Sequence, residues 1–446
     1  MDLDRHIAAR LAAAVPAGVP ICVGLSGGLD SVVLLDGLGL VAPARGHALT
    51  AVHVHHGLSP NADAWARFCA ELCDARGIPL SIERVHVARD AGEGMEAAAR
   101  ARRHAVYAAR AEPFVALAHH LDDQAETVLL QVLRGTGLKG LAAMPELREL
   151  PGSHVRLFRP LLGVARSALR EHAGARALRW IEDESNASLA PDRNYLRHEI
   201  APRLDARFAG WREATARCAG HAAAGSRLAD ELARLDGVPS APGAGLALDV
   251  RLCAERRANA VRAFLALEGL AMPSRARLAE MTRQLYEARG DARVRVLHDG
   301  AMLVRHRGVA RVAPRVADAE SPGWRVAWHG EDRIDLGAGR GEVRFAPALG
   351  AGIAADLGRA GEWHFAPRLG GERLRLSPAG PSRTLKNLLR EAAIPEWQRE
   401  RLPILFRGGR VAWVPGIGVA AEFSCSAGRA GLVPAWSPGA IFPPAG

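Results

Sequence analysis

The sequence predicts an α/β protein: a parallel β-sheet domain, then a mainly helical middle domain and a small α+β C-terminal domain. Three observations support this class. Short β-rich runs alternate four times with helical segments between residue 18 and about residue 130, a pattern typical of βαβ units. The first of these runs ends in a Gly-rich turn. The chain has 446 residues, 49% of them hydrophobic, which is enough for about three domains with buried cores.

The elements of the N-terminal part follow one another in a regular order. An amphipathic helix is predicted at the N-terminus. The expected strands are 19–25, 48–55, 80–87 and 114–118, and the helices that follow them are 31–40, 61–76, 95–111 and 122–133. In a parallel sheet of this kind, ligands bind beyond the carboxyl ends of the strands.

The remainder of the chain changes character several times. Residues 159–217 read as polar and helical, 220–287 as helical and rich in Ala, Leu and Arg, and 291–345 as short β-rich runs. A Gly/Ala/Pro-rich stretch predicts a linker, and a helix at 382–392 lies among short strands. We therefore expect domains at 1–217, 218–345 and 361–446, with a linker at 346–360.

Composition excludes several classes of protein. Charged residues make up 24%, close to the globular average, which argues against disorder, collagen and coiled coils. The formal net charge of +10 and the pI of about 10.1 favour an anionic partner. Only Lys139 and Lys386 are lysines, however, so part of this charge reflects a coding bias toward arginine.

The cysteines and the N-terminus favour a cytoplasmic protein. The six cysteines include no C-x-x-C pair, so the spacing of a disulfide framework, zinc ribbon or iron–sulfur site is missing. The first residues carry acids where a signal peptide needs bases. The most apolar stretch, 21–40, contains Asp30 and Asp36, so neither a membrane span nor a membrane partner is expected.

A Gly-rich loop between the first strand and helix is the first candidate site. Backbone N–H groups at a helix N-terminus and two glycines suit a phosphate, and Asp30 suits a Mg²⁺ ion held against it. The alternative is an ordinary Gly-rich turn with a capping side chain. A Walker loop is excluded because neither lysine follows a glycine. The candidate residues are Ser26, Gly27, Gly28, Leu29, Asp30 and Ser31.

A second motif, H-H-L-D-D-Q-A-E-T at 119–127, follows the fourth strand. Asp123 and Glu126 are three residues apart and share one face of the helix. They suit Mg²⁺ or a cationic substrate, whereas the alternative is an acidic first turn that complements the helix dipole. His119 and His120 could form a metal site, but adjacent histidines are more often a structural pair, with one side chain buried and the other exposed.

A third motif, D-E-S-N at 183–186, is followed by R-N-Y-L-R at 193–197. Arg193 and Arg197 are four residues apart and offer two guanidinium forks for phosphate. The alternative is a solvated helix face.

These motifs together carry a resemblance to a known family. The S-G-G-x-D-S loop resembles that of the N-type ATP pyrophosphatase (PP-loop) superfamily, whose members cleave ATP to AMP and pyrophosphate. The ordered set is similar to the bacterial tRNA(Ile)-lysidine synthetases. It adds H-V-H-H-G-L at 53–58, M-E-A-A-A-R at 95–100, R-G-T-G-L-K-G-L at 134–141 and R-P-L-L at 159–162. In the C-terminal part, S-R-T-L-K-N-L-L at 382–389 and I-P-E-W-Q-R at 394–399 resemble the family's C-terminal domain.

The resemblance implies a ligase that uses ATP to adenylate the wobble cytidine of the CAU-anticodon tRNA(Ile). Free L-lysine then displaces AMP to give lysidine, so that AUA is read instead of AUG. Residues 1–217 would be the Rossmann-like catalytic domain, and 218–345 and 361–446 would bind tRNA. The implied cofactors are ATP and Mg²⁺, and the implied compartment is the cytoplasm. The oligomeric state stays open, with a homodimer as one expectation.

The resemblance also assigns roles to individual residues. Asp30 would hold Mg²⁺, and the loop at 26–31 would bind the leaving pyrophosphate. Asp123 and Glu126 would hold the lysine, and His56 would pack against the nucleotide. Arg197 and Arg193 would lie near the adenylate or the cytidine phosphate. Asp30, Asp123, Glu126 and Arg197 form the expected catalytic set, although Ser59 departs from the arginine that many members carry there.

A basic segment in the C-terminal domain is the expected tRNA surface. Residues 365–410 contain ten basic residues against four acidic ones, a concentration that suits phosphate contacts. An Arg-rich solvated surface is the alternative. Trp397 and Trp413 are expected in the core more than in base stacking. The expected tRNA-binding residues, besides Arg193, are Arg383, Lys386, Arg390 and Arg399.

Three other functions are alternatives to the ligase, and a feature of the sequence argues against each of them. A cytidine 2-thiolase of tRNA would usually need a cysteine pair or cluster, and the chain has no C-x-x-C. An adenylating amidotransferase for small molecules would not need a basic C-terminal domain. A noncatalytic tRNA-binding protein would have no reason to keep every position of the phosphate loop.

Overall fold

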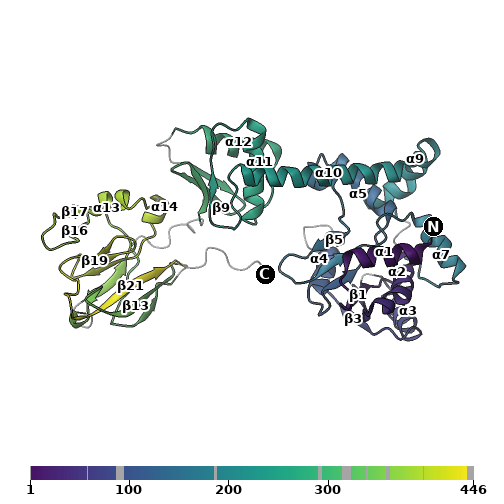
Figure 1. Ribbon diagram of the computed structural model, residues 1–446, viewed down its shortest axis with the longest axis horizontal. Coiled ribbons are helices and arrows are strands. Elements are labelled where there is room, and N and C mark those ends of the chain that lie inside the picture. Colours follow the sequence, from purple (N-terminus) through teal and green to yellow (C-terminus); the bar gives the residue numbers. More distant parts are fainter. Residues whose placement is uncertain are drawn as a thin grey trace. The chain divides into compact units, whose positions relative to one another are not determined.

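The computed structural model describes residues 2–57, 59–86, 95–184, 188–289, 294–313, 323–337, 340–357, 362–394 and 396–438. The chain divides into two compact units, Met1–Ala229 and Asp230–Gly446 (Figure 1). The two units are described separately below. Among the described residues, no helix is both long enough and apolar enough to cross a membrane.

A six-stranded sheet forms the centre of the first unit. Its order is β3-β2-β1-β4-β6-β5, with all neighbours parallel except β5 and β6. The parallel α/β fold and its four predicted strands are confirmed, whereas β5 and β6 were not predicted. The strands are β1 (Ile21–Gly24), β2 (Leu49–His55), β3 (Leu80–Arg84), β4 (Phe114–Ala116), β5 (Leu147–Glu149) and β6 (Arg156–Phe158).

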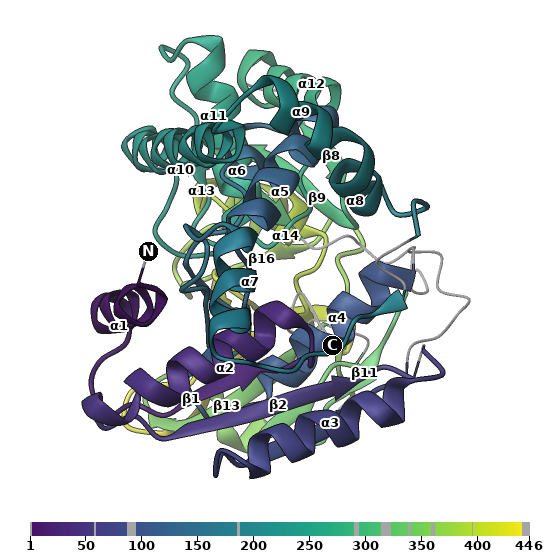
Figure 2. The ribbon, with the colours of Figure 1, turned by 90° about the vertical axis from the view of Figure 1, so that its right-hand side faces the viewer.

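Alternating side chains cover the two faces of this sheet. Ile21 and Val23 enter a core shared with four helices, whereas Cys22 between them faces a second core that includes Tyr107. This alternation is what a strand buried on both faces requires. The helices of the first core are α1 (Leu3–Ala14), α2 (Leu29–Val41), α3 (Ala62–Asp74) and α7 (Arg166–Ala175), and Tyr107 comes from α4 (Met95–Ala108). Figure 2 shows α2 alongside β1 and β2.

A group of helices lies beyond the carboxyl end of β4. Helix α5 (Leu121–Leu133) packs through Ala125 against Ala201 and Trp211. The helices of this group after α5 are α6 (Leu138–Leu141), α8 (Asp192–Tyr195), the π-helical turn η3 (Leu196–Ile200), α9 (Ala201–Arg207) and α10 (Trp211–Leu235). Helix α10 spans both the expected boundary at 217/218 and the division between the two units.

The second unit begins with a small α+β assembly. Helices α11 (Ala254–Leu267) and α12 (Arg275–Glu287) pack over an antiparallel sheet of order β7-β10-β9-β8. The strands are β7 (Leu246–Ala247), β8 (Arg295–His298), β9 (Ala301–His306) and β10 (Val309–Ala313). The middle part is therefore helical with a sheet, as its two compositional stretches predicted.

The C-terminal part contains two larger antiparallel sheets around an aromatic core, together with a two-stranded sheet of β16 (Arg373–Leu374) and β17 (Arg383–Thr384). One has the order β11-β15-β18-β19-β20 and the other β12-β13-β21-β14. The first sheet contains β11 (Val326–Ala327), β15 (Trp363–Ala366), β18 (Ile404–Arg407), β19 (Arg410–Val414) and β20 (Gly418–Val419). The second contains β12 (Arg333–Asp335), β13 (Glu342–Leu349), β14 (Ile353–Ala354) and β21 (Ala430–Ser437). Trp328 stacks on Phe345 between the sheets, with ring centroids 4.1 Å apart.

The structure corrects the linker expected at 346–360. Strand β13 runs to Leu349 and pairs with β21 over eight positions, from Glu342 opposite Ser437 to Leu349 opposite Ala430. Strand β14 and the short turn η4 (Ala355–Leu357) follow within the same stretch. The Ala and Pro residues at 346–348 are tolerated because β12 pairs only with residues 342–344 of β13, so the end of the strand pairs with β21 alone and is largely exposed.

Candidate active site

The Gly-rich loop is held in shape by Ser31. Its Oγ accepts hydrogen bonds from the amides of Ser26 and Gly27, both at 3.2 Å, and donates to the carbonyl of Gly28 at 2.9 Å. Gly27 has φ +88°, and a Cβ there would lie 2.7 Å from Ile181 Cδ1. Glycine is therefore required at this position. The side chain of Leu29 is buried in the core, so this residue contributes only its backbone to the loop.

Asp30 lies in the first turn of α2, at the mouth of this loop. Its Oδ2 is 3.6 Å from His120 Nε2, and its Oδ1 is 3.5 Å from Arg166 Nε. Oδ1 is buried and accepts no hydrogen bond, so it retains a lone pair for a small cation. Among the described residues, no three His, Cys, Asp or Glu side chains form a metal site by themselves. A Mg²⁺ ion here would need phosphate oxygens as further ligands, as such ions commonly do.

His120 connects the loop with the carboxylates after β4. It is the N-cap of α5: its Nδ1 accepts from the amide of Asp123 at 3.3 Å, while Asp123 Oδ2 accepts from the amide of His120 at 3.1 Å. Its Nε2 lies 3.3 Å from Asp123 Oδ2. Burial lowers the pKa of His120, but Asp30 and Asp123 outweigh burial and raise it. The ring is thus a buried bridge between Asp30 and Asp123.

Arg197 occupies the two carboxylates that were expected to hold lysine. Its Nε and Nη2 donate to the two oxygens of Glu126, both at 2.8 Å, and Nη2 also lies 3.2 Å from Asp123 Oδ1. Arg193 donates from Nη2 to Thr127 Oγ1 at 2.6 Å, and its Nε is 3.4 Å from Glu126. The structure therefore places Asp30, Asp123, Glu126 and Arg197 in one site. A phosphate contact by either arginine would require a change of partner.

Burial and charge act in opposite directions on these carboxyl groups. The Glu126 side chain is only 4% exposed, and burial raises its pKa even though Arg197 acts to lower it. Burial also acts to raise the pKa of Asp123, but His120, His119 and Arg193 outweigh this effect and lower it. Asp123 is thus the more firmly ionised of the two.

A small cavity of about 190 Å³ opens beside this ion pair. Its lining mixes acidic and basic groups with one aromatic side chain: Asp122, Glu126, Arg166, Arg197, Ala201, Trp211 and Arg212. Arg212 Nε lies 2.6 Å from Asp122, which also accepts from the amide of Arg166 at 2.9 Å. Arg166 and Arg212 could not be predicted from the sequence, because they are far from the motifs and carry no local signal of their own.

His56 lies at the carboxyl end of β2, on the far side of the Gly-rich loop from β4. It is half-buried, and its Nδ1 is buried without a hydrogen bond. Burial and the nearby Arg103 lower its pKa to about 4, so the ring is neutral at physiological pH. Of the third motif, Ser185 and Asn186 lie outside the described residues, as does Leu58 beside His56.

Two of the four basic residues expected to contact tRNA lie on the outer face of α13 (Leu385–Glu391). Lys386 and Arg390 are exposed, whereas Leu385, Leu388 and Leu389 are buried. Arg383, in β17 (Arg383–Thr384), forms an ion pair with Glu391. Arg399, in α14 (Glu396–Arg399), donates to the carbonyl of Ile394 at 2.6 Å.

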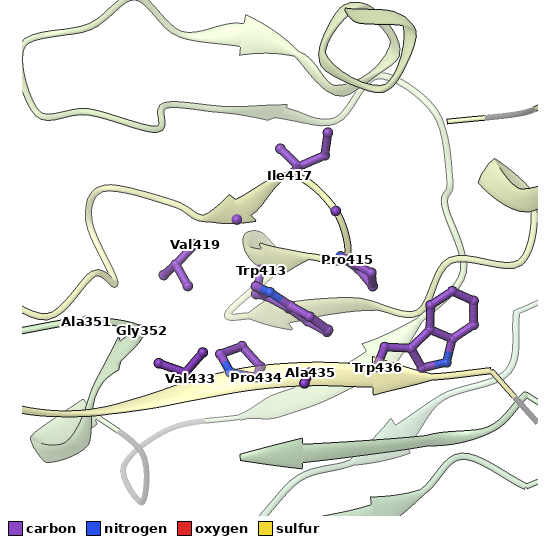
Figure 3. A pocket seen from close by; sticks show the side chains of 12 residues that line it. Ala351, Gly352, Trp413, Pro415, Ile417, Val419, Val433, Pro434, Ala435 and Trp436 are labelled. Atoms are coloured by element: carbon purple, nitrogen blue, oxygen red, sulfur yellow. The ribbon is translucent and has the colours of Figure 1, made fainter. Parts of the chain in front are cut away.

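Trp413 belongs to the core, as expected, and the side chain of Trp397 lies outside the described part. An open hollow of about 510 Å³ separates strands of the two C-terminal sheets. Figure 3 shows Val433, Pro434 and Trp436 of β21 on one side of it, facing Trp413 and Val419. The lining contains no charged side chain, so the hollow offers nothing for the chemistry of the loop.

The parallel sheet and the phosphate-type loop at its carboxyl edge define a PP-loop protein. A family profile described as "PP-loop domain" matches residues 3–204. Two further profiles match the second unit: "TilS substrate binding domain" at residues 250–310 and "TilS substrate C-terminal domain" at 364–436.

Full-length relatives narrow this class to one family. The chain is 47% identical over 437 residues to the tRNA(Ile)-lysidine synthase of Azoarcus sp. (strain BH72), covering 96% of this chain and 94% of the relative. It is 38% identical to that of Nitrosomonas europaea, covering 97% and 95%, and 42% identical to that of Aromatoleum aromaticum, covering 96% and 99%. The chain belongs to the tRNA(Ile)-lysidine synthase family.

Proposed function

We propose that this protein joins free L-lysine to C2 of the wobble cytidine of a CAU-anticodon tRNA(Ile), with cleavage of ATP to AMP and pyrophosphate. One observation supports the proposal most directly. The Gly-rich loop follows β1, a pair of buried carboxylates follows the adjacent parallel strand β4, and His120 lies between Asp30 of the loop and Asp123. The loop suits the triphosphate of ATP, and the carboxylates suit the cation of lysine. The family membership supports the same reaction and the same tRNA.

The first step forms the adenylate. O2 of the cytidine attacks the α-phosphorus of ATP, the bond to the β-phosphate oxygen breaks, and pyrophosphate leaves. The amides of Leu29–Ser31 at the N-terminus of α2 bind the departing pyrophosphate and stabilise the charge that develops on it. The amides of Ser26 and Gly27 join them only after they leave Ser31 Oγ. Ser31 keeps the loop open for this anion through its hydrogen bonds to the loop backbone.

Asp30 would hold a Mg²⁺ ion in this step. Its unpartnered Oδ1 fits that role. When bound, the ion neutralises charge on the phosphate oxygens. The residues around Asp30 restrict its position, because His120 lies beside one oxygen and Arg166 beside the other.

The second step replaces AMP by lysine. The ε-ammonium of lysine first gives up a proton to solvent, the amine nitrogen attacks C2, the C2–O bond breaks and AMP leaves with that oxygen. The nitrogen then loses a second proton to solvent. Asp123 and Glu126 hold the cationic amino acid beside the adenylated base. Arg197 leaves them for this to occur, and its guanidinium then has a new partner available in the phosphate of the adenylate.

The remaining parts of the chain bind the tRNA. We infer that residues 218–345 and the exposed bases of α13 contact it through phosphates. The reaction places the protein in the cytoplasm, where its three substrates occur. A homodimer is compatible with this proposal, and no step in it requires one.

The direct test supplies purified protein with ATP, lysine and an unmodified tRNA(Ile) transcript bearing a CAU anticodon. Pyrophosphate release and incorporation of labelled lysine are measured in parallel. We expect lysine to join this transcript and not one with a different wobble base. Pyrophosphate release with tRNA but without lysine incorporation would retain adenylation and reject lysine as the nucleophile. An absence of turnover would favour a noncatalytic tRNA-binding protein.

A further inference from the structure

Arg159 is a buried guanidinium at the same edge of the sheet as the proposed active site. It directly follows β6, which lies beside β4 and runs parallel to it, so it lies near His119 and His120. Arg159 is 2% exposed. Its amide donates to Glu146 O and its Nη1 to Pro145 O, both at 2.8 Å, whereas Nε has no hydrogen-bond partner. A buried cation is costly without an anionic partner.

Other arginines lie near Arg159. Arg148 lies on β5 opposite Leu157, the residue two before Arg159. Arg100 and Arg103 lie near the middle of α4. Burial, and to a smaller extent Arg148 and Arg100, lower the pKa of Arg159 to about 10. The pKa of the half-buried His104 is lowered to about 4, first by burial and then by these four arginines.

The neighbouring acids do not balance this positive charge. Glu146 pairs with Arg10, and Glu149 lies 3.4 Å from Arg156. In the part of the chain that the structure describes, Arg103, Arg148 and Arg159 make no ion pair with a carboxylate. The cluster therefore has the composition of an anion site whose ligand comes from outside the protein.

We propose that the exposed Arg103 and Arg148, with the positive charge of the buried Arg159 beneath them, bind a phosphodiester of the tRNA anticodon loop, directly beside the wobble cytidine. The inference rests on the proposed tRNA substrate. The Gly-rich loop follows β1, whereas Arg159 follows β6 and Arg148 lies on the neighbouring β5, with the carboxylates after β4 between the loop and these arginines. A cytidine that reaches both ATP and the carboxylates thus places its own backbone over β4 and β6, within reach of the guanidinium groups.

Direct binding of anticodon stem-loop RNAs tests this site. One RNA is unmodified, and two others carry a single neutral methylphosphonate in place of the phosphate 5′ or 3′ of the wobble cytidine. We expect one replacement to weaken binding to the unaltered protein about tenfold, because one charged contact to phosphate is lost. The same replacement should have little effect on the Arg148→Ala and Arg103→Ala variants, which already lack part of the site.

Each variant should also lower the slope of log Kd against log salt by about 0.7 to 0.9 for the unmodified RNA. The ATP affinity should stay unchanged. Arg156→Ala is the matched control, since it removes an arginine of the same sheet that is paired with Glu149. Arg148 and Arg103 are exposed, so their variants are expected to fold, unlike a variant at the buried Arg159.

Three outcomes would overturn the proposal. Equal sensitivity of Arg148→Ala and the unaltered protein to both replacements would show that the arginines contact neither phosphate. A loss of ATP affinity with RNA binding retained would make the cluster a nucleotide-phosphate site. A variant that binds RNA as tightly as Arg156→Ala would also reject it. Lysine incorporation by the unaltered protein, measured alongside, keeps a failure of the proposed reaction separate from all three.

Discussion

At the scale of single residues, Asp30 differs from the carboxylates around it. Asp123 and Glu126 are engaged by Arg197, and Asp122 by Arg212. Asp30 Oδ1 also lies near an arginine, 3.5 Å from Arg166 Nε, but it is buried and accepts no hydrogen bond. Of these four carboxylates, it is therefore the one most available to a cation that arrives with ATP.

We predict that Asp30→Ala abolishes lysine incorporation while leaving tRNA affinity within about twofold. The substitution removes the proposed Mg²⁺ ligand but no basic side chain, so phosphate contacts are retained. Turnover and filter binding with the same tRNA preparation measure the two effects. Loss of both to the same degree would contradict the assignment of Asp30 to the ATP site.

The carboxylates after β4 give a second prediction at this scale. Asp123→Asn or Glu126→Gln should raise KM for lysine at least tenfold, with a much smaller change in KM for ATP, because each removes a charge that pairs with the substrate cation. Steady-state kinetics with each substrate varied in turn measures both. Glu171→Gln, an exposed change on α7, is the control. A larger effect on ATP would identify the carboxylates as metal ligands.

At the scale of elements, α13 shows how one short helix separates its two functions. Its leucines hold it against the core, and this fixes the direction in which Lys386 and Arg390 project. The two basic residues are four apart and therefore lie on the same face. A helix anchored in this way can present charge to a phosphate backbone at little entropic cost.

We predict that the Lys386→Ala, Arg390→Ala double variant binds tRNA(Ile) several-fold more weakly and with a lower salt slope, by about 1 to 2. KM values for ATP and lysine should not change, since α13 belongs to a different compact unit from the catalytic loop. Fluorescence titration of labelled tRNA at several salt concentrations is the measurement. An unchanged slope would assign these residues to an ordinary solvated surface.

At the scale of the whole molecule, the three histidines with the most strongly lowered pKa values link folding to pH, and His120, whose pKa is raised, acts in the opposite direction. The pKa of His56 is lowered to about 4, that of His104 to about 4 and that of His119 to about 3, in each case chiefly by burial. In the unfolded chain each pKa returns to about 6.5. Between these values the unfolded state binds more protons than the folded state, so the free energy of unfolding decreases as pH falls.

We predict a loss of stability on lowering the pH from 7 to 5, on the order of 1 kcal/mol per histidine before screening by solvent. Urea denaturation at the two pH values, followed by circular dichroism, measures it. The His104→Gln variant should show a smaller difference, because it lacks one of the three groups. An equal or larger difference in that variant would exclude His104 as a contributor.

Only some strands of the fold could be predicted from the sequence. The four parallel strands were predictable because each apolar run is followed by a helical segment with clear periodicity, with Gly or polar turns between them, although β4 itself has only three residues. Strand β6, Arg156–Phe158, is equally short, and no helix separates it from β5, so the alternation of strand and helix does not reveal it. Strand β13 was not predicted because Gly, Ala and Pro residues lie in and around it. Its partner β21 is also distant in the sequence, about 80 residues further on.

The active-site residues divide in the same way. The loop at 26–31 and the acids after β4 were predictable because their spacing is local and chemically specific. The pairing of Arg197 with Glu126 joins residues 71 positions apart, and only the packing of η3 against α5 brings them together. The cluster of Arg103, Arg148 and Arg159 was not predicted for a related reason, since its members come together through β5 and β6, which were not predicted.

The contact between Arg197 and Glu126 has a consequence for the affinity of the incoming amino acid. The guanidinium is tethered to the protein, so it acts as a competitor at a high effective concentration. A lysine ammonium therefore gains only the difference in free energy between two pairings. Any ligand that draws Arg197 toward itself removes this competitor, so free lysine is admitted most readily after the nucleotide is in place.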